Sequence, residues 1–363
     1  MDYLLLFIFS GILTVILTWL IKQFSLKQNI LDLPDNGGRK IHKKPIPLLG
    51  GLALIISVSL SIIGYLHFYT PNLAIVPIKF FLGILLAGLT LAVGGFLDDK
   101  YTLPPKVLWL FPALASLIVV TSGIGVGIKF ISNPFGEAIY IGHTISIFFL
   151  KFSLSALLIW IWLMGMIFTT KFLDGLDGLC SGIGLIASLT FFCLSLTEKI
   201  NQPITASLSI ILAGALVGYL FFAFYPASIF LGEAGSTFIG LMLGVLSVIL
   251  GAKIATALLV MGIPILDVAW AIIRRMYYKQ SPFKADKSHL HHRLLDIGLS
   301  QKQAVLSLWT ISAIFGATAL FLQSKGKLIA LIILFILMLV LALATVVLYK
   351  YRHPHIHNRI DEK

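Results

Sequence analysis

Apolar stretches of roughly 20 residues, separated by short polar segments, recur from one end of this chain to the other. Each stretch is long enough to cross a bilayer as a helix, and a helix pairs its backbone groups internally, as lipid requires. The pattern therefore predicts an all-α, polytopic integral membrane protein with about eleven transmembrane helices. The predicted spans are 3–22, 47–69, 78–97, 105–122, 152–169, 179–197, 204–224, 235–251, 255–273, 304–322 and 328–349.

We expect a single multi-span domain over residues 1–350, followed by a disordered cytoplasmic tail over 351–363. The first span is a retained one, because Asp2 precedes it and neither a basic region nor a small-residue cleavage site accompanies it. The segment 122–151 is the long gap without a span. Its glycines and short β-prone runs predict a small hairpin or surface segment.

Composition supports a membrane protein, because only 12% of residues are charged, against about 25% in soluble domains. The net charge of +12 comes largely from a few basic loops. Membrane topology and an anionic substrate explain this charge better than nucleic acid, so no nucleic-acid partner is expected. Cys180 and Cys193 fall within one span, where we interpret them as packing residues and not as a disulfide.

The basic residues also predict an orientation. They gather after the first and ninth spans and at the C-terminus, all on one side if the span count holds. The positive-inside rule places that side in the cytoplasm, with the N-terminus outside and the C-terminus inside the plasma membrane. The polar clusters then share the cytoplasmic face: Arg39, Lys40, His42, Asp98, Asp99, Asp174, Asp177, Glu233, His289, His291 and His292. We therefore predict one active site at that surface.

Asp98 and Asp99 end the third span. Adjacent acids point to different sides of a helix, so one of them binds a given ion while the other orients a group or acts as a base. Paired carboxylates at a helix end are typical of Mg²⁺ chemistry with phosphates. The alternative is a solvated helix end whose charge Lys100 and Lys106 neutralise.

Asp174 and Asp177 lie between two spans, three residues apart, and would share one face of a helical segment. Charge near membrane depth is costly, so this pair favours a functional site over a solvated loop. Glu233 lies between two glycines where the eighth span begins. It either caps its own helix or serves as a third metal ligand.

His289, His291 and His292 precede Arg293 in the longest predicted cytoplasmic loop. No partner stands at a spacing typical of zinc, so a nucleotide diphosphate suits this cluster better than a zinc ion. A surface-exposed histidine run is the alternative. The basic run around Arg39 and Lys40 binds either substrate or anionic lipid headgroups.

Five motifs in this order resemble those of the polyprenyl-phosphate N-acetylhexosamine-1-phosphate transferases. They are R-K-x-H with P-x-P-x-x-G-G, G-x-x-D-D, D-G-L-D-G-L, F-L-G-E-x-G-S and D-x-x-H-x-H-H-R-L, and they extend over nearly the whole chain. The resemblance implies transfer of a sugar 1-phosphate, with N-acetylglucosamine as the expected sugar, from a UDP-sugar to undecaprenyl phosphate. UMP would be released, in the first membrane step of cell-envelope polysaccharide synthesis.

The resemblance also implies Mg²⁺, with Mn²⁺ as the alternative cation, bound by Glu233, Asp99 and Asp177. Asp98 or Asp99 would contact or deprotonate the lipid phosphate, and Asp174 and Asp177 would organise the nucleotide and metal region. The substrate-binding set would be Arg39, Lys40, His42, Lys171, His289, His291, His292 and Arg293. A homodimer is compatible with the sequence.

The chain departs from the family pattern at three positions. Phe168 and Lys171 stand where the family usually has Asn, and Glu233 stands where most members have Asp. These departures motivate an inactive family member as one alternative. The related phospho-N-acetylmuramoyl-pentapeptide transferase and a polytopic transporter are the others, although a transporter predicts acids near mid-membrane and inverted repeats, which the sequence does not show.

Overall fold

The computed structural model places nearly all of the predicted apolar segments in helices. It describes residues 2–34, 42–69, 77–125, 128, 130, 131, 133, 137, 139–147, 150–251, 253–277, 279 and 289–352. The helices are α1 Tyr3–Lys27, α2 Gly50–Tyr69, α3 Ile78–Tyr101, α4 Pro105–Leu108, α5 Leu110–Thr121, α6 Leu154–Leu173, α7 Leu179–Ser195, α8 Pro203–Ala223, α9 Gly232–Ile249, α10 Ile254–Val260, α11 Gly262–Tyr277, α12 Leu290–Asp296, α13 Gln301–Phe321 and α14 Ser324–Arg352. The all-α polytopic prediction is confirmed.

Each of the eleven predicted segments contains a helix, but fewer meet the length and hydropathy expected of a span. Within the described part of the chain, eight helices do so, and the bent pair α10–α11 would make a ninth. The helical stretch Pro105–Thr121 and α7 are apolar but shorter. The count of eleven spans is therefore not confirmed. The tail beyond Arg352 lies outside the described residues.

Short strands occur only at the ends of the helical bundle. In the described residues they form three antiparallel pairs: β1 Leu31–Asp32 with β2 Ile46–Pro47, β3 Phe130–Ile131 with β4 Ile139–Tyr140, and β5 Thr144–Ile147 with β6 Leu150–Ser153. The β3–β4 and β5–β6 pairs confirm the hairpin predicted between residues 122 and 151. Cys180 and Cys193 are both free, as predicted.

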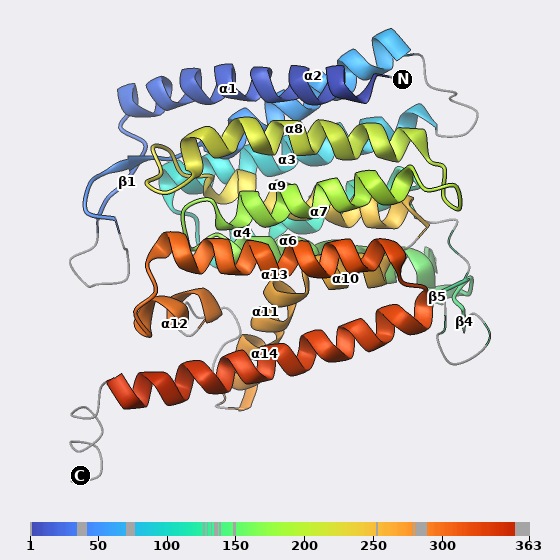
Figure 1. The fold of residues 1–363 in the computed structure, drawn as a ribbon. Coiled ribbons are helices and arrows are strands. Elements are labelled where there is room, and N and C mark those ends of the chain that lie inside the picture. Colours follow the sequence, from blue (N-terminus) through green and yellow to red (C-terminus); the bar gives the residue numbers. More distant parts are fainter. Residues whose placement is uncertain are drawn as a thin grey trace.

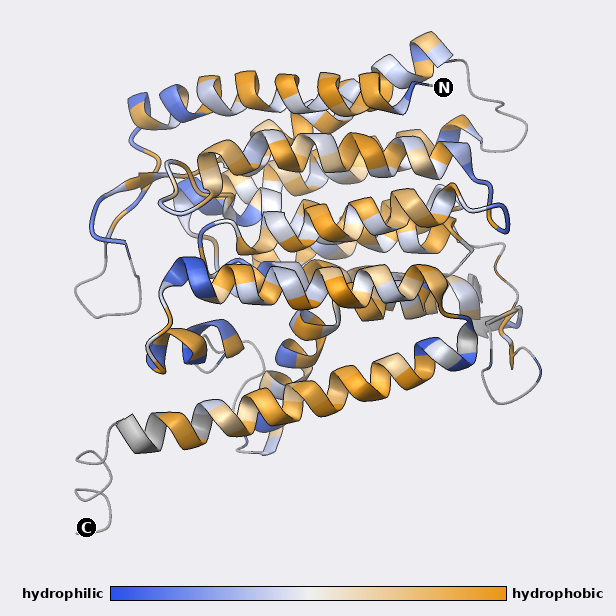
Figure 2. Ribbon diagram, in the orientation of Figure 1, coloured by the Kyte–Doolittle hydropathy of each residue, from blue (hydrophilic) through white to orange (hydrophobic). Residues whose placement is uncertain are grey.

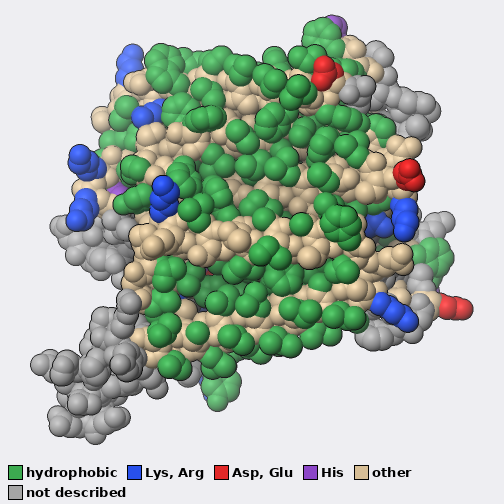
Figure 3. All heavy atoms as spheres, viewed as in Figure 1, with side chains coloured by type: hydrophobic (Ala, Val, Ile, Leu, Met, Phe, Trp, Pro, Cys, Tyr) green, Lys and Arg blue, Asp and Glu red, His purple; other side chains and the backbone are tan. Residues whose placement is uncertain are grey.

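The helices run side by side as one bundle (Figure 1). α1 starts at one end of the bundle and α14 finishes at the other, which is what an odd number of crossings requires. Hydrophobic residues dominate the middle of the bundle, and hydrophilic segments gather at both ends (Figure 2). The space-filling view shows the same division, with an apolar belt between charged side chains at the two ends (Figure 3). This distribution fits a bilayer around the belt.

α9 forms the centre of the core. It is buried along nearly its whole length and packs against α2, α3, α6 and α7. α1 lies on the outside, where small polar groups join it to α2: Thr14 Oγ1 donates to Ser57 Oγ at 2.6 Å, and Ser57 Oγ donates to the carbonyl oxygen of Ser10 at 3.0 Å. Such hydrogen bonds stabilise helix pairs in lipid, where hydrophobicity alone does not.

α10 and α11 are bent against each other by 85°. The break falls at Met261, and Pro264 follows it inside the first turn of α11, where its missing N–H is tolerated. α11 therefore turns out of the bundle and contacts both α6 and α14 (Figure 1). This bend decides which side chains reach the site described below.

Gly51 offers a test of the packing between α2 and α9. A methyl group at this position would overlap the backbone nitrogen of Gly235 and approach the carbonyl oxygen of Leu231 at 2.7 Å. Backbone cannot yield as a flexible side chain does, so we expect Gly51→Ala to destabilise the protein by about 1–3 kcal/mol. Thermal unfolding in detergent measures this. Gly64→Ala in the same helix is the control, because nothing lies within 4 Å of its added methyl, and equal unfolding temperatures would contradict the prediction.

Candidate active site

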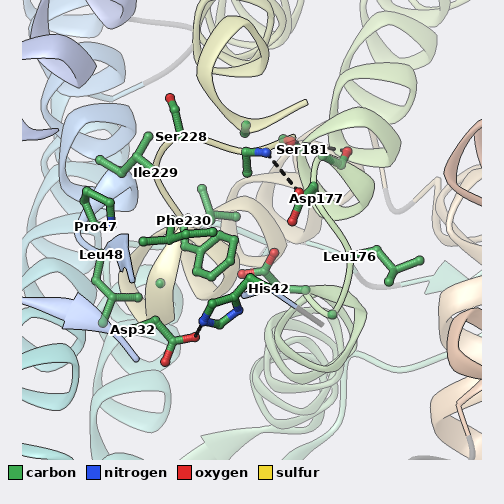
Figure 4. Close-up of a pocket in the computed structure, with 18 of the residues that line it drawn as sticks. Asp32, His42, Pro47, Leu48, Leu176, Asp177, Ser181, Ser228, Ile229 and Phe230 are labelled. Carbon is green, nitrogen blue, oxygen red and sulfur yellow. Dashed lines mark hydrogen bonds and ion pairs between the residues drawn. The ribbon is translucent and has the colours of Figure 1, made fainter. Parts of the chain in front are cut away.

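A cavity of about 1450 Å³ opens at the end of the bundle where α3 and α6 finish and α9 begins. Its wall combines carboxylates, cations and imidazoles from segments far apart in the sequence: Asp98, Asp99, Lys171, Asp174, Asp177, Arg275, His42, His289, His291 and His292. Apolar side chains such as Leu48, Leu176 and Ile229 complete the wall (Figure 4). The structure therefore brings most of the predicted site residues into one place.

Asp98 and Asp99 point in different directions, as predicted for adjacent residues of a helix. Asp98 Oδ1 accepts the backbone N–H of Leu103 at 2.9 Å and so caps the end of α3. Asp99 Oδ1 accepts the backbone N–H of Glu233 at 3.3 Å. Asp99 therefore supplies the negative charge that the N-terminus of α9 attracts, while its Oδ2 is buried without a hydrogen-bond partner in the structure.

Gly232 makes this approach between α3 and α9 possible. Its φ angle of +69° is one that side chains disfavour, and a methyl group there would overlap Asp99 Oδ2. The Asp99 carboxylate consequently reaches the start of α9 directly. Gly232 of the F-L-G-E-x-G-S motif thus has a packing reason as well as a conformational one.

Glu233 does not cap its own helix; its partner is Lys171. Lys171 Nζ lies 2.7 Å from Glu233 Oε1, and the side chains are 22% and 12% exposed. The same ammonium group lies 5.9 Å from the centre of the Phe168 ring. The three positions that depart from the family pattern therefore form one contact cluster, although Glu233 is far from the other two in sequence.

The loop that follows α6 contributes Asp174 and Asp177. Asp174 follows the last residue of α6, and burial, helped by the negative charges of Glu233, Asp99 and Asp177, raises its pKa to about 7. Asp177 Oδ2 accepts the backbone N–H of Ala227 at 2.9 Å (Figure 4). That bond joins this loop to the segment between α8 and α9, so the two sides of the cavity hold each other in place.

The histidines stack beside the acidic loop. The ring of His289 lies between Phe172, with centroids 6.0 Å apart, and His291, with centroids 5.7 Å apart and an interplanar angle of 5°. The imidazole of His291 also lies against Gly175 of the acidic loop. Burial, followed by the neighbouring His292 and His289, lowers the pKa of His291 well below its ordinary value. His291 is therefore neutral at physiological pH.

His42 lies on the side of the cavity formed by the loop between α1 and α2. Its Nε2 is 3.6 Å from Asp32 Oδ2, and its ring meets Phe230 edge-on at 5.3 Å (Figure 4). Arg39 and Lys40, predicted to bind substrate, lie outside the described residues. Arg293 is described, on α12, but it is not among the residues that line the cavity. Its substrate contact stays a prediction.

Two residues of α11 were not singled out from the sequence: Arg275, which lines the cavity, and Asp267, which contacts a histidine that lines it. Asp267 Oδ2 pairs with His289 Nδ1 at 2.8 Å, and Asp267 Oδ1 accepts the backbone N–H of Leu290 at 2.9 Å. Arg275, only 3% exposed, places a guanidinium group in the wall. An acid inside an apolar segment is itself a signal of function. That signal could have identified Asp267, whereas Arg275 looked like one more basic loop residue.

The chain is similar to known proteins of one family. The model of glycosyl transferase family 4 matches residues 81–251. The chain is 32% identical over 336 residues, 91% of its length and 87% of the relative's, to a probable undecaprenyl-phosphate N-acetylglucosaminyl 1-phosphate transferase of Bacillus subtilis. The chain belongs to glycosyl transferase family 4.

Two other relatives of this family-4 protein are also named as polyprenyl-phosphate N-acetylglucosamine phosphate transferases. It is 30% identical, over 88% of the chain and 82% of the relative, to a decaprenyl-phosphate N-acetylglucosaminephosphotransferase of Mycolicibacterium smegmatis. It is 28% identical, over 78% of the chain and 79% of the relative, to an undecaprenyl-phosphate alpha-N-acetylglucosaminyl 1-phosphate transferase of Thermotoga maritima. The family-4 match covers α3 to α9, and therefore the acidic side of the cavity.

Proposed function

We propose that this family-4 protein transfers N-acetylglucosamine 1-phosphate from its UDP derivative to a polyprenyl phosphate and releases UMP. The observation that carries the proposal is the shared cavity, in which the acids of α3 and the Asp174–Asp177 loop face imidazoles of the α12 region at one end of an apolar bundle. One substrate is a lipid and the other is aqueous, so the reaction must occur where the bundle meets water. The names of the relatives support the same reaction.

In the proposed reaction, an oxygen of the lipid phosphate forms a bond to the sugar-side phosphorus of the donor. The bond between that phosphorus and the bridging oxygen breaks, and UMP leaves with the bonding electrons. A phosphate monoester has a second pKa of about 6 and is already largely dianionic at neutral pH, so the nucleophile needs no strong base. The main obstacle is the repulsion between two anions.

Residues of this chain are suited to reduce that repulsion. The Arg275 guanidinium group presents a planar array of donors, which matches phosphate oxygens well. An ionised Asp267 only accepts hydrogen bonds, so it keeps a proton on His289 Nδ1 and leaves Nε2 for another contact. The neutral His291 adds a polar group without adding charge. We assign these residues to the diphosphate of the donor.

We also propose that the site uses Mg²⁺. Among the described residues, no three His, Cys, Asp or Glu side chains stand close enough to bind a metal ion by themselves. Mg²⁺ needs no such cage, because it is usually held by one or two carboxylates together with substrate phosphates and water. Asp99 fits, since its buried Oδ2 has no hydrogen-bond partner among the described residues; the backbone N–H of Glu233 contacts Asp99, and Asp177 lines the same cavity. The ion would neutralise charge on the transferring phosphoryl group.

The decisive experiment is release of UMP by the purified protein in detergent, with undecaprenyl phosphate and a panel of UDP-sugars. We expect UDP-N-acetylglucosamine to be the best donor and EDTA to stop the reaction. Transfer from UDP-N-acetylmuramoyl-pentapeptide instead would favour the related pentapeptide transferase. No UMP from any donor would contradict the proposal and favour an inactive family member or a transporter.

Asp267 gives a prediction that sequence reasoning alone did not provide. Asp267→Ala removes the acceptor for both His289 Nδ1 and the Leu290 N–H. Removing the partner that orients a functional histidine typically lowers activity by about 10- to 100-fold, and we expect the rate of UMP release to fall by that amount. Asp267→Asn, which can still accept the backbone bond, should lose less. An unchanged rate in Asp267→Ala would show that the His289 orientation does not matter.

We further propose that the cavity faces the cytoplasm and the N-terminus the outside. α1 begins at the end of the bundle opposite to α12 (Figure 1), and the described basic residues Lys43, Lys44 and Arg275 line the cavity. Cysteine variants at Leu33, beside the cavity, and at Lys199, at the other end, test this orientation. A membrane-impermeant thiol reagent applied to intact cells should label Lys199→Cys and spare Leu33→Cys. The reverse labelling would place the cavity outside the cell and contradict the proposed orientation.

A further inference from the structure

The contact between Lys171 and Glu233 joins the end of α6 to the beginning of α9. Lys171 Nζ lies 2.7 Å from Glu233 Oε1, and both side chains are largely buried. The Phe168 ring, one turn earlier in α6, lies 5.9 Å from the same ammonium group. Lys171 lines the cavity and Glu233 lies behind it, so water screens the pair only partly.

Asp99 is tied to the same place. Its Oδ1 accepts the backbone N–H of Glu233, while its Oδ2 is buried and has no hydrogen-bond partner in the part of the chain that the structure describes. Two carboxylates thus meet at the N-terminus of α9, and one of them already neutralises a lysine. A divalent cation that uses both carboxylates would have to share Glu233 with the ammonium group or displace it.

We infer that Lys171 is an internal competitor for the divalent cation, so that the Lys171–Glu233 pair lowers the affinity of this site for the metal. This inference rests on the proposed function insofar as the metal serves phosphoryl transfer. The energetic reason is that cation entry must weaken a close, partly buried ion pair before Glu233 can act as a ligand.

The same exchange couples the metal to the substrate. Once Glu233 holds a divalent cation, the Lys171 ammonium group loses its partner while still in the cavity wall, where an anionic phosphate is the natural replacement. Metal and diphosphate would therefore bind cooperatively, and the coupling would be reciprocal. Lys171 thus neutralises Glu233 before the substrate binds and neutralises a phosphate of the substrate afterwards.

Mn²⁺ binding to the purified protein tests this inference without donor or acceptor. The electron paramagnetic resonance signal of free Mn²⁺ gives the dissociation constant directly. We expect Lys171→Met to bind Mn²⁺ about tenfold more tightly than the unmodified protein, within the range typical of coupled sites. Lys171→Arg retains the charge and should not tighten binding. Lys171→Gln serves if the methionine variant is not monodisperse.

Loss of any positive charge near a cation site raises cation affinity to some degree, so a matched control is needed. Lys22 lines the same cavity and makes no ion pair with Glu233 in the structure. Lys22→Met should therefore tighten Mn²⁺ binding much less than Lys171→Met. Equal effects of the two variants, unchanged or weaker binding in Lys171→Met, or no Mn²⁺ binding in any variant would each overturn the inference.

Failure of this inference and failure of the proposed function are distinguishable, because the binding assay contains no substrate. If the protein transferred the sugar phosphate but both lysine variants bound Mn²⁺ equally well, only the inference that Lys171 competes with the cation would be contradicted. Tight Mn²⁺ binding in Lys171→Met, together with no UMP from any donor, would support the competition and contradict the transferase proposal.

Discussion

Asp99→Asn is expected to reduce UMP release by about 1000-fold or more, the scale typical of lost electrostatic stabilisation in a transition state. Asparagine keeps the size of the side chain and an oxygen that can accept the Glu233 N–H, so the junction between α3 and α9 should survive. What disappears is the charge and the buried Oδ2, which no described residue contacts by a hydrogen bond. Radiolabelled transfer measures the rate, and thermal unfolding in detergent checks the fold.

Two carboxylates serve as controls for Asp99. Asp296→Asn on the exposed side of α12 removes one negative charge outside the cavity and should leave the rate unchanged. Asp98→Asn should cost less than Asp99→Asn, because Asp98 Oδ1 is occupied by the Leu103 N–H at the end of α3. Full activity in a folded Asp99→Asn variant would exclude Asp99 from both the metal and the phosphate roles.

Asp177→Asn is the second variant for which we expect a large loss, about 100- to 1000-fold in UMP release. Asp177 Oδ2 accepts the Ala227 N–H at 2.9 Å, and an asparagine oxygen can keep that bond. The loss would therefore report the missing charge and not a displaced loop. The measurement is UMP release at saturating donor over a series of Mg²⁺ concentrations, since a lost metal ligand raises the Mg²⁺ requirement.

Asp32→Asn provides the matched comparison for Asp177. It removes a carboxylate from the same cavity, but from the side where Asp32 contacts His42. We expect a smaller loss and an unchanged Mg²⁺ requirement. If Asp177→Asn kept both the rate and the Mg²⁺ requirement of the unmodified protein, Asp177 would have only the structural role of holding Ala227.

The arrangement of spans was largely predictable, because burial in lipid leaves a strong periodic signal and forces helices. The errors have local causes. α7 begins at Leu179, as predicted, but ends at Ser195, two residues before the predicted end, because the chain turns at Leu196. The predicted ninth span is interrupted at Met261 and bent by 85°. A hydropathy pattern shows that a segment is apolar, but it does not show that the segment is straight.

Within the site, the acids and histidines were predictable because polar residues at the ends of apolar segments are costly and therefore informative. Their partners were not. The sequence left open whether Glu233 caps α9 or binds a metal. In the structure Glu233 does not cap α9 and is paired with Lys171, while its role as a metal ligand stays a prediction. Asp267 was passed over inside an apolar run, although it holds His289. Pairings of this kind join residues on different helices, and no local spacing encodes them.

The sequence by itself determined that this protein is a helical membrane protein whose acids and histidines lie at the ends of its spans, because hydrophobic burial acts on each segment separately. The tertiary structure decided which of those groups meet. Asp99 reaches the N-terminus of α9 because Gly232 has no side chain there. The bent helix α11 brings Arg275 to the cavity and places Asp267 against His289, which lines the cavity. Contacts between distant segments depend on how the helices pack, and packing is a property of the whole chain.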